Sequence, residues 1–353
     1  MPNIPRFTSF LCLLSCICFA FTERTESIVQ VIGNGDMPNV AVGHDGKIYV
    51  VYGKKDSIFC TYSSNKAKTF SSPSLIAVLP RMFSFAMRGP QIASTNYGLV
   101  ITAMTQAGNI YALTSSDGLR WSKPARLNDA DSSAPEGLMS IAADGNNVFA
   151  VWLDTRGNRR NKIYGSVSED GGRSWLPNSL IYSSPDSTVC ECCKPSVIMK
   201  GKHVYAMFRN WLDQNRDLYL ASSSDGGKTF APPEKLGTGS WKLNGCPMDG
   251  GSLDVNDQGK VQTIWRRQSK IYTVQPGEPE VELGEGKNCT LVSLENQNIY
   301  AWVDKGEIVI SGSAGKLIKP GKGSNPVLKK LDRTTAICVW GNNNQIEAAV
   351  ITF

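Results

Sequence analysis

The chain has 353 residues, a hydrophobic content of 41% and a net charge of +6. A chain of this length can bury a large core and, as a closed repeat, can still form a single domain. The positive charges are spread along the sequence, and no Lys/Arg-rich run interleaves with aromatic residues, which argues against a nucleic-acid-binding protein. The 33 glycines and 18 prolines suit many short strands joined by turns.

Residues 1–22 are predicted to be a secretory signal peptide. Arg6 precedes an apolar run, Phe10 to Phe21, that is too short to span a membrane. Two endings are open: Cys18-Phe19-Ala20 resembles a small-residue cleavage site, and Leu13-Leu14-Ser15-Cys16 resembles a bacterial lipobox with Cys16 as the lipid anchor. The apolar residues after Cys16 favour simple cleavage. No other membrane span is expected, so we predict a soluble protein that is secreted or periplasmic, and a lipoprotein if Cys16 is modified.

One short segment recurs along the chain. It reads Ser-x-Asp-x-Gly-x-Thr/Ser-Trp/Phe, with clear copies at 168–175 and 223–230, a copy shorter by one residue at 115–121, and a degenerate copy at 63–70. Ser, Asp and Gly supply turn chemistry, and the closing Trp or Phe is an apolar plug that pins the turn to a sheet. Four copies in order indicate a repeat protein.

Each copy belongs to a longer unit of short strands. A unit opens with an apolar strand, usually at a proline, and continues with a polar turn, a strongly β second strand, a loop and a third strand. The units are expected to begin at Pro38, Pro90, Pro135, Pro195, Pro247, Cys289 and Pro326. A period of roughly 40 to 60 residues with four strands per unit is typical of a β-propeller blade.

The ends of the chain are expected to close the ring. The last unit supplies three strands before Phe353, and the strand predicted at Ser27–Ile32 can complete it. Closure removes exposed sheet edges that invite aggregation. We therefore predict an all-β fold, a single β-propeller over residues 27–353. The best count is seven blades, with six as the alternative if the last two weak units merge.

The recurring segment is the Asp-box, or BNR repeat, and over most of residues 37–274 the chain resembles the sialidase superfamily, including secreted bacterial sialidase-like proteins. Sialidases of this family bind the sugar carboxylate with three arginines, the first in a Phe/Tyr-Arg-Ile-Pro motif, and use a Tyr–Glu nucleophile pair with an Asp acid/base. Here blade one opens Gly35-Asp36-Met37-Pro38, so Asp36 stands where the first arginine is expected. The loops of the sixth unit also lack the tyrosine, and Asp-boxes occur in non-hydrolytic propellers as well.

The loops that lead into the inner strands, together with the loops between second and third strands, share one propeller face and meet at its axis. The candidate acids and bases in these loops are Asp36, Glu136, Asp154 and Asp249. The candidate ligand-binding arginines are Arg88, Arg156, Arg209, Arg216 and Arg266, of which Arg88, Arg209 and Arg266 could form a carboxylate clamp. The structural alternative is a salt-bridge lattice that ties the loops together. The Asp-boxes are expected on the opposite side.

Seven of the ten cysteines lie beyond the predicted signal peptide, and an odd number leaves at least one thiol unpaired. Cys190, Cys192 and Cys193 lead into blade four, while Cys246 and Met248 lead into the neighbouring blade five. The favoured interpretation is a disulfide from the first loop to Cys246. The alternative is a soft-metal site of thiolates and the Met248 thioether, suited to Cu(I) or Zn. Cys60 and Cys338 are expected to be buried within strands.

Three functional hypotheses follow. The first is a secreted, sialidase-like glycoside hydrolase that acts on an acidic glycan at the axial face. The second is a non-catalytic propeller that binds a glycan, an acidic small molecule or a protein partner at the same face. The third is a metal or redox role for the cysteine cluster. We expect no cofactor and a monomer.

Overall fold

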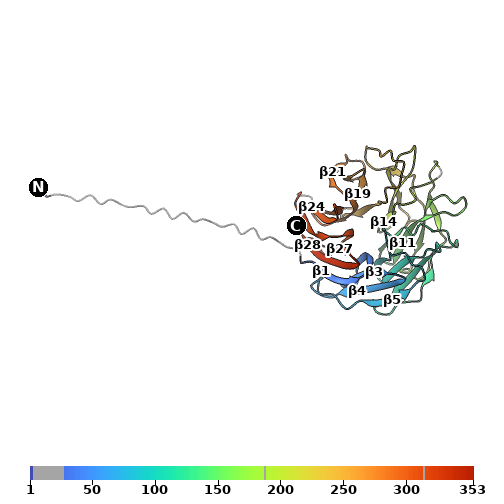
Figure 1. The fold of residues 1–353 in the computed structure, drawn as a ribbon, viewed down its shortest axis with the longest axis horizontal. Helices are drawn as coiled ribbons and strands as arrows, with labels where there is room; N and C mark the ends of the chain where they lie inside the picture. The colour runs from blue at the N-terminus through green and yellow to red at the C-terminus, as the bar shows by residue number, and fades with distance from the viewer. Residues whose placement is uncertain (3–27, 187, 313–314) are drawn as a thin grey trace.

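The computed structural model describes residues 1–2, 28–186, 188–312 and 315–353; the predicted signal peptide and Cys16 lie outside this part of the chain, apart from the first two residues. In these described ranges, 28 strands form seven four-stranded antiparallel sheets arranged as a β-propeller (Figure 1). Within the described ranges no helix is long and apolar enough to cross a membrane. The predicted all-β class and the count of seven blades are confirmed.

In blades 1 to 6 the four strands follow one another in sequence, starting with the innermost strand. Blade 1 is β2 (Asp36–Val42), β3 (Ile48–Lys54), β4 (Ser57–Ser63) and β5 (Ser74–Val78). Blade 2 is β6 (Gln91–Thr95), β7 (Gly98–Met104), β8 (Ile110–Ser115) and β9 (Ala125–Arg126). Blade 3 is β10 (Met139–Asp144), β11 (Asn147–Asp154), β12 (Lys162–Ser168) and β13 (Ser179–Tyr182). Blade 4 is β14 (Ser196–Lys200), β15 (His203–Arg209), β16 (Leu218–Ser223) and β17 (Glu234–Lys235). Blade 5 is β18 (Gly251–Val255), β19 (Val261–Arg267), β20 (Lys270–Val274) and β21 (Val281–Glu285). Blade 6 is β22 (Lys287–Ser293), β23 (Asn298–Asp304), β24 (Glu307–Gly312) and β25 (Leu317–Lys322).

Blade 7 joins the two ends of the chain. It contains β26 (Ser324–Lys330), β27 (Thr335–Asn342) and β28 (Gln345–Thr352), and its fourth strand is β1 (Gln30–Asn34). Gln30 pairs with Ala348 and Asn34 with Gln345, so the N-terminal strand closes the ring as predicted but extends further, to Asn34. Closure gives the last C-terminal strand a partner on both sides.

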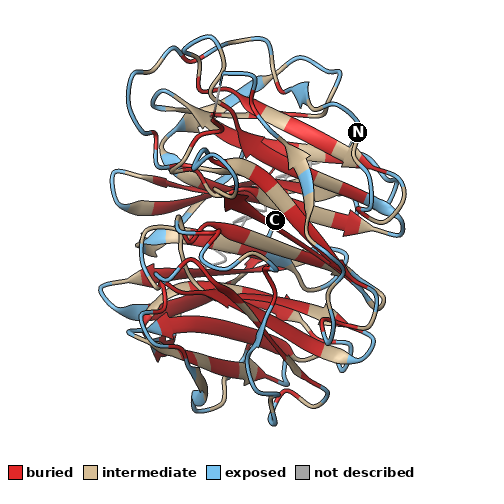
Figure 2. Ribbon diagram, turned by 90° about the vertical axis from the view of Figure 1, so that its right-hand side faces the viewer, coloured by how far each residue is buried: buried red, intermediate tan, exposed pale blue. Residues whose placement is uncertain are grey.

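The core lies between neighbouring blades. Phe149 of blade 3 packs in one cluster with Phe208 of blade 4, and Trp340 of blade 7 packs with Ile308 of blade 6. Second strands are therefore buried on both faces; in β11 every residue after Asn147 is buried. Figure 2 shows this burial concentrated in the strands, while the connecting loops are mostly exposed. A stack of blades packed in this way is a rigid support for the loops at the axis.

The four Asp-boxes occupy the loops between the third and fourth strands of blades 1 to 4, and each packs against the preceding blade of the ring. In the box of blade 3, Ser168 Oγ donates to Asp170 Oδ1 at 2.8 Å and accepts from the Gly172 amide at 2.8 Å. Gly172 has a φ of 87°, and a Cβ there would lie 2.5 Å from Val100 of blade 2. In the box of blade 4, a Cβ on Gly227 would likewise lie 2.4 Å from Phe149 of blade 3. The boxes therefore contribute to structure, away from the axial loops.

Candidate functional site

A cavity of about 560 Å³ runs along the propeller axis, lined by the inner strands of all seven blades. At the end where the chain leads into the inner strands, its lining includes Met37, Met87, Lys194, Asp249, Asn288 and Asn325. We call this end the axial mouth. Two chains of hydrogen-bonded polar side chains line it, one centred on Lys194 and one on Asp249.

The first polar chain joins blades 4, 2 and 1. Lys194 Nζ donates to Gln91 Oε1 at 2.8 Å, and Asn39 Nδ2 donates to the same oxygen at 3.2 Å. Gln91 Nε2 in turn donates to the carbonyls of Gly89 and Pro90, which fixes its oxygen toward Lys194. Burial lowers the pKa of Lys194 to about 8, because the ammonium has lost most of its water and gained only an amide partner.

The second polar chain joins blades 5, 6 and 7. Asp249 Oδ2 accepts from the backbone N–H of Asn288 at 3.0 Å and lies 3.7 Å from Arg266 Nη1. Asn288 Nδ2 then donates to Asn325 Oδ1 at 2.6 Å. Asp249 is 1% exposed, and burial raises its pKa to about 6 despite the hydrogen bond and the nearby arginines. A carboxyl group with such a pKa can hold or release a proton near neutral pH.

Irregular backbone places three of these residues. Met37, Asn288 and Asn325 have φ values of 55°, 54° and 50°, and each lies where the pairing of its inner strand shifts register. Such bulges turn the chain locally and often lie beside functional sites. Asn tolerates this left-handed conformation, whereas Met does not favour it, so the backbone at Met37 is strained. A Cβ on Gly89 would lie 2.3 Å from the Met37 Cβ, which shows how tightly blades 1 and 2 meet here.

The three arginines of the predicted clamp donate to backbone carbonyls. Arg209 is 2% exposed and donates to the carbonyls of Asp249, Arg216 and Arg266 at 3.2, 2.6 and 2.8 Å. Arg88 donates to the carbonyl of Glu136 at 2.5 Å, and burial lowers the pKa of its guanidinium. Arg266 donates to the carbonyls of Gln268 and Pro247 and lies beside Asp249. Each therefore ties axial loops together.

The remaining predicted residues fall into separate groups. Asp154 is fully buried and accepts from Ser133 Oγ, Trp152 Nε1 and Arg156, and Arg156 also pairs with Asp129 at 2.7 Å. This group is a salt-bridge lattice of the kind considered from the sequence. Glu136 accepts from Asn161 Nδ2 at 3.3 Å. Asp36 is half-buried at the start of β2, and burial raises its pKa.

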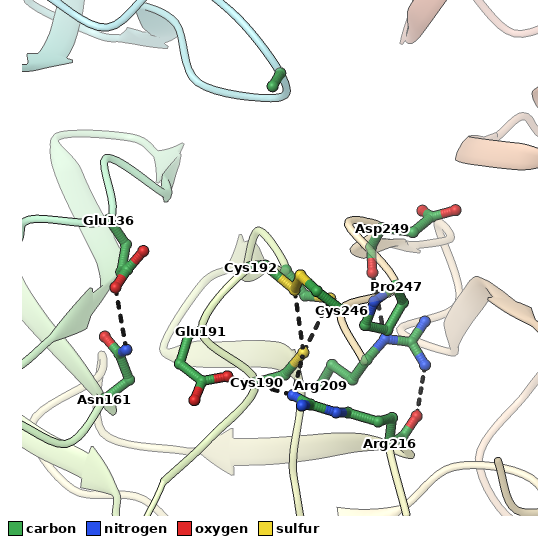
Figure 3. Close-up of a disulfide and its surroundings, with 12 residues drawn as sticks. Glu136, Asn161, Cys190, Glu191, Cys192, Arg209, Arg216, Cys246, Pro247 and Asp249 are labelled. Carbon is green, nitrogen blue, oxygen red and sulfur yellow. Dashed lines mark hydrogen bonds and ion pairs between the residues drawn. A yellow bond between two sulfur atoms is a disulfide. The ribbon is translucent and has the colours of Figure 1, made fainter. Parts of the chain in front are cut away.

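The cysteine loops are joined by a disulfide between Cys192 and Cys246, with a Cα–Cα distance of 6.2 Å (Figure 3). This bond confirms the predicted disulfide between the loops that lead into blades 4 and 5. Cys190 and Cys193 are free and buried, as are Cys60, Cys289 and Cys338. Met248 is 46% exposed. Because Cys192 and Cys246 are joined in the disulfide, their sulfurs are not free thiolates. The cluster in this oxidised form therefore does not offer the sulfur ligands of the predicted soft-metal site.

Arg216, another predicted binding residue, belongs to the cysteine cluster. Its Nη1 donates to Cys190 Sγ at 3.2 Å and to Glu191 Oε2 at 3.3 Å (Figure 3). Its guanidinium also lies over the Trp211 ring. A hydrogen bond with Cys193 and the charges of Arg209 and Arg216 lower the pKa of Cys190 to about 6. Burial raises the pKa of Cys193.

Of the sequence candidates, only Asp249 and Arg266 belong to the two polar chains of the axial mouth. The amide side chains at the mouth were not among the residues predicted from the sequence, and Lys194 had no predicted role; these amides belong to Asn39, Gln91, Asn288 and Asn325. A signal for three of them was present: Asn39, Gln91 and Asn325 each adjoin a proline that opens a unit. Amides are weaker sequence signals than charged residues because they occur in most turns.

Comparisons with known proteins agree with this architecture. Residues 94–247 match the family described as BNR repeat-like domain. No match is found among curated proteins. Among solved structures, the chain is similar to a protein of unknown function from Dyadobacter fermentans DSM 18053, with 16% identity, coverage of 93% of this chain and 98% of that chain, and a TM-score of 0.57.

Two further solved structures share the fold. One is YCF48 bound to D1 peptide, with 13% identity, coverage of 94% and 97%, and a TM-score of 0.56. The other is a polysaccharide lyase of family PL25, an ulvan lyase bound to -[GlcA(1-4)Rha3S]-, with 12% identity, coverage of 92% and 96%, and a TM-score of 0.55. At these identities the likeness concerns the fold alone. The four Asp-boxes, the seven blades and the match over residues 94–247 show that the chain is a β-propeller with BNR (Asp-box) repeats.

Proposed function

We propose that this propeller binds an acidic saccharide at the axial mouth and holds the sugar carboxylate at Lys194. The observation that carries this proposal is the position of the Lys194 ammonium, which lines the axial cavity with an amide as its hydrogen-bond partner. Among the described residues no carboxylate forms an ion pair with it. A buried ammonium without a counter-ion gains most from a ligand that supplies one.

The rest of the mouth suits the hydroxyl groups of a sugar. Asn39, Gln91, Asn288 and Asn325 offer amide donors and acceptors on several sides of the axis. Met37 and Met87 add apolar surface for the sugar ring. A concave site with a few convergent polar groups is typical of small-ligand recognition.

Binding without hydrolysis is favoured because the arginines of the predicted clamp already donate hydrogen bonds to backbone carbonyls. A sialidase-type clamp requires guanidinium groups that are free to bind a carboxylate bidentately. Arg209 instead directs its donors to three backbone carbonyls within the protein. The absence of the blade-one arginine at Asp36 points the same way.

Hydrolysis of an acidic glycoside is a second candidate, and Asp249 favours it. A carboxyl group that lines the cavity with a pKa of about 6 is partly protonated near neutral pH, as a general acid must be. The partner carboxylate would be Asp36 or Glu136, the other candidates of the same face. In such a glycoside hydrolase, Asp249 would be the general acid.

Binding and turnover can be measured on the same saccharides. Sialate- and uronate-containing oligosaccharides and matched neutral ones are titrated calorimetrically into the purified protein, its Lys194→Met variant and a Lys202→Gln control at an exposed turn. We expect acidic saccharides to bind, Lys194→Met to lose about tenfold or more in affinity, and the control to match the wild type. No binding of any acidic saccharide, or full binding by Lys194→Met, contradicts the proposal. Turnover that Asp249→Asn abolishes favours the hydrolase instead.

A further inference from the structure

Four sulfur atoms gather where the loops leading into blades 4 and 5 meet, and none of their residues lines the axial cavity. Cys192 and Cys246 form the disulfide. Cys190 Sγ lies 3.7 Å from Cys192 Sγ on one side and 3.2 Å from Cys193 Sγ on the other. We call these four residues the cysteine cluster. The Cys190 thiol thus contacts both the Cys192–Cys246 disulfide (Figure 3) and a second thiol, that of Cys193.

The surroundings of Cys190 stabilise its thiolate form. Arg216 donates to its sulfur at 3.2 Å, and the positive charge of Arg209 acts on the same atom. The thiolate is the form that attacks a disulfide, and neighbouring arginines and a Cys-x-x-Cys spacing both favour it. Cys190 and Cys193 have that spacing, and the buried Cys193 keeps its proton.

Accessibility differs within the cysteine cluster. Cys190 and Cys193 are almost completely buried, Cys192 is intermediate and Cys246 is exposed. A reagent or partner in solution therefore reaches the cluster at Cys246. The buried pair can react only with its neighbour, the Cys192–Cys246 disulfide.

We propose that the cysteine cluster is an internal thiol–disulfide relay, in which the disulfide moves between the outer pair Cys192–Cys246 and the buried pair Cys190–Cys193. The proposal is independent of the ligand at the axial mouth.

The relay consists of two exchange steps. In the first, the Cys190 thiolate attacks Cys192 Sγ; a Cys190–Cys192 bond forms, the Cys192–Cys246 bond breaks, and the electron pair leaves with Cys246 as a thiolate. In the second, Cys193 gives up its proton and attacks Cys190 Sγ as a thiolate; a Cys190–Cys193 bond forms, the Cys190–Cys192 bond breaks, and the electron pair leaves with Cys192. The proton of Cys193 passes to one of the two released sulfurs. One disulfide, one thiolate and one thiol are present before and after, so no external oxidant or reductant is required.

The exchange has a structural consequence. The bond that staples the loop of blade 4 to the loop of blade 5 opens, and Cys246 becomes an exposed thiol. The molecule then presents to solvent a reactive group that the starting form keeps in a disulfide.

Trapping at Cys246 tests the relay without any variant. The native protein is incubated with N-ethylmaleimide in the absence of reductant, quenched with acid, digested with trypsin and mapped by mass spectrometry without reduction. Cleavage after Lys200 and Lys242 places Cys246 on a different peptide from the other three cysteines. We expect maleimide on Cys246 and a disulfide between Cys190 and Cys193, and because alkylation is irreversible it collects even a minor exchanged form. A Cys246 that stays unlabelled and bound to Cys192 overturns the proposal.

Variants identify the attacking sulfur. Cys190→Ala should abolish the labelling of Cys246, and Cys193→Ser should arrest the exchange as a Cys190–Cys192 bond with Cys246 labelled. Cys60→Ala, which removes a buried thiol of blade 1, is the matched control and should behave as the wild type. Labelling of Cys246 that persists in Cys190→Ala contradicts the relay. So does a purified protein in which all four cysteines hold stoichiometric zinc or copper instead of a disulfide.

Discussion

Lys194 Nζ donates to Gln91 Oε1 at 2.8 Å, and this bond joins two blades that are not neighbours in the ring. The side chain of Lys194 leaves the loop before β14 in blade 4 and meets a residue of β6 in blade 2 at the axial mouth. The ammonium is thereby held beside the cavity in poor water contact, which is unfavourable for folding and favourable for an anionic ligand.

Lys194→Met should make the folded protein more stable while it removes ligand binding. Burial lowers the pKa of Lys194 to about 8 from its ordinary value of 10.5, so the charged side chain is less stable in the folded state. Allowing for partial exposure to the cavity, we expect a gain of about 1–2 kcal/mol at neutral pH. Urea unfolding of both proteins measures it. In the wild type, stability should also rise as the pH increases from about 8 to 10.5, a rise that the variant lacks. Equal stability of the two proteins at every pH contradicts this account of Lys194.

Affinity for an acidic saccharide should fall as the pH rises through about 8, because the Lys194 ammonium then loses the charge that attracts the carboxylate. Lys194→Arg retains its charge at alkaline pH and should retain binding there. Calorimetric titrations between pH 7 and about 9.5 make the comparison. An affinity that is unchanged across this range in the wild type would show that the charge of Lys194 is not used.

Asp249→Asn should remove a pH dependence of stability at acidic pH. Burial raises the pKa of Asp249 from 3.8 to about 6, so the folded state binds the proton more tightly than the unfolded state does. Wild-type stability should therefore fall as the pH rises between about 4 and 6, and Asn, which can still accept from the Asn288 amide, should flatten this part of the profile. Denaturant unfolding across this range checks it. Parallel profiles for the two proteins would mean that Asp249 titrates normally.

Gly227→Ala should destabilise the protein more than Gly226→Ala does. Both glycines of this Asp-box have positive φ, 89° and 81°, so both substitutions carry the conformational cost of the left-handed region. Only at Gly227 would the new Cβ collide with Phe149 of the preceding blade, at 2.4 Å, whereas nothing lies within 4 Å of the one at Gly226. The additional loss should be about 1–3 kcal/mol by thermal or urea unfolding. Equal losses would rule out a clamping role for the box.

The architecture was predictable because its signals are local and repeated. The Asp-box recurs four times, and its Ser, Asp and Gly form the same turn in each clear copy, as the bonds of Ser168 and Ser223 show. The N-terminal strand of the propeller was predictable because an unclosed ring leaves an edge, which β1 fills. The disulfide followed from the adjacency of two loops in neighbouring blades.

The axial mouth was predictable only in part. Whether a residue lines it depends on the direction of its side chain, and sequence spacing does not predict that direction. Arg209 ends β15 of blade 4 and Asp249 lies just before β18 of the neighbouring blade 5. Arg209 nevertheless turns into the protein toward backbone carbonyls, while Asp249 lines the cavity. Lys194 is one residue beyond Cys193, but its role depends on reaching an amide 103 residues earlier in the chain. Bulges at Met37, Asn288 and Asn325 rotate these residues at the mouth, and a periodic pattern does not reveal such irregularities.

The most direct test is a crystal structure of the protein with an acidic oligosaccharide that the titrations show to bind. We predict that the sugar carboxylate lies within about 3 Å of Lys194 Nζ at the axial mouth, where it replaces or shares the bond to Gln91. A saccharide bound on the outer surface of the blades, or one in the cavity with its carboxylate directed away from Lys194, would contradict the proposed function.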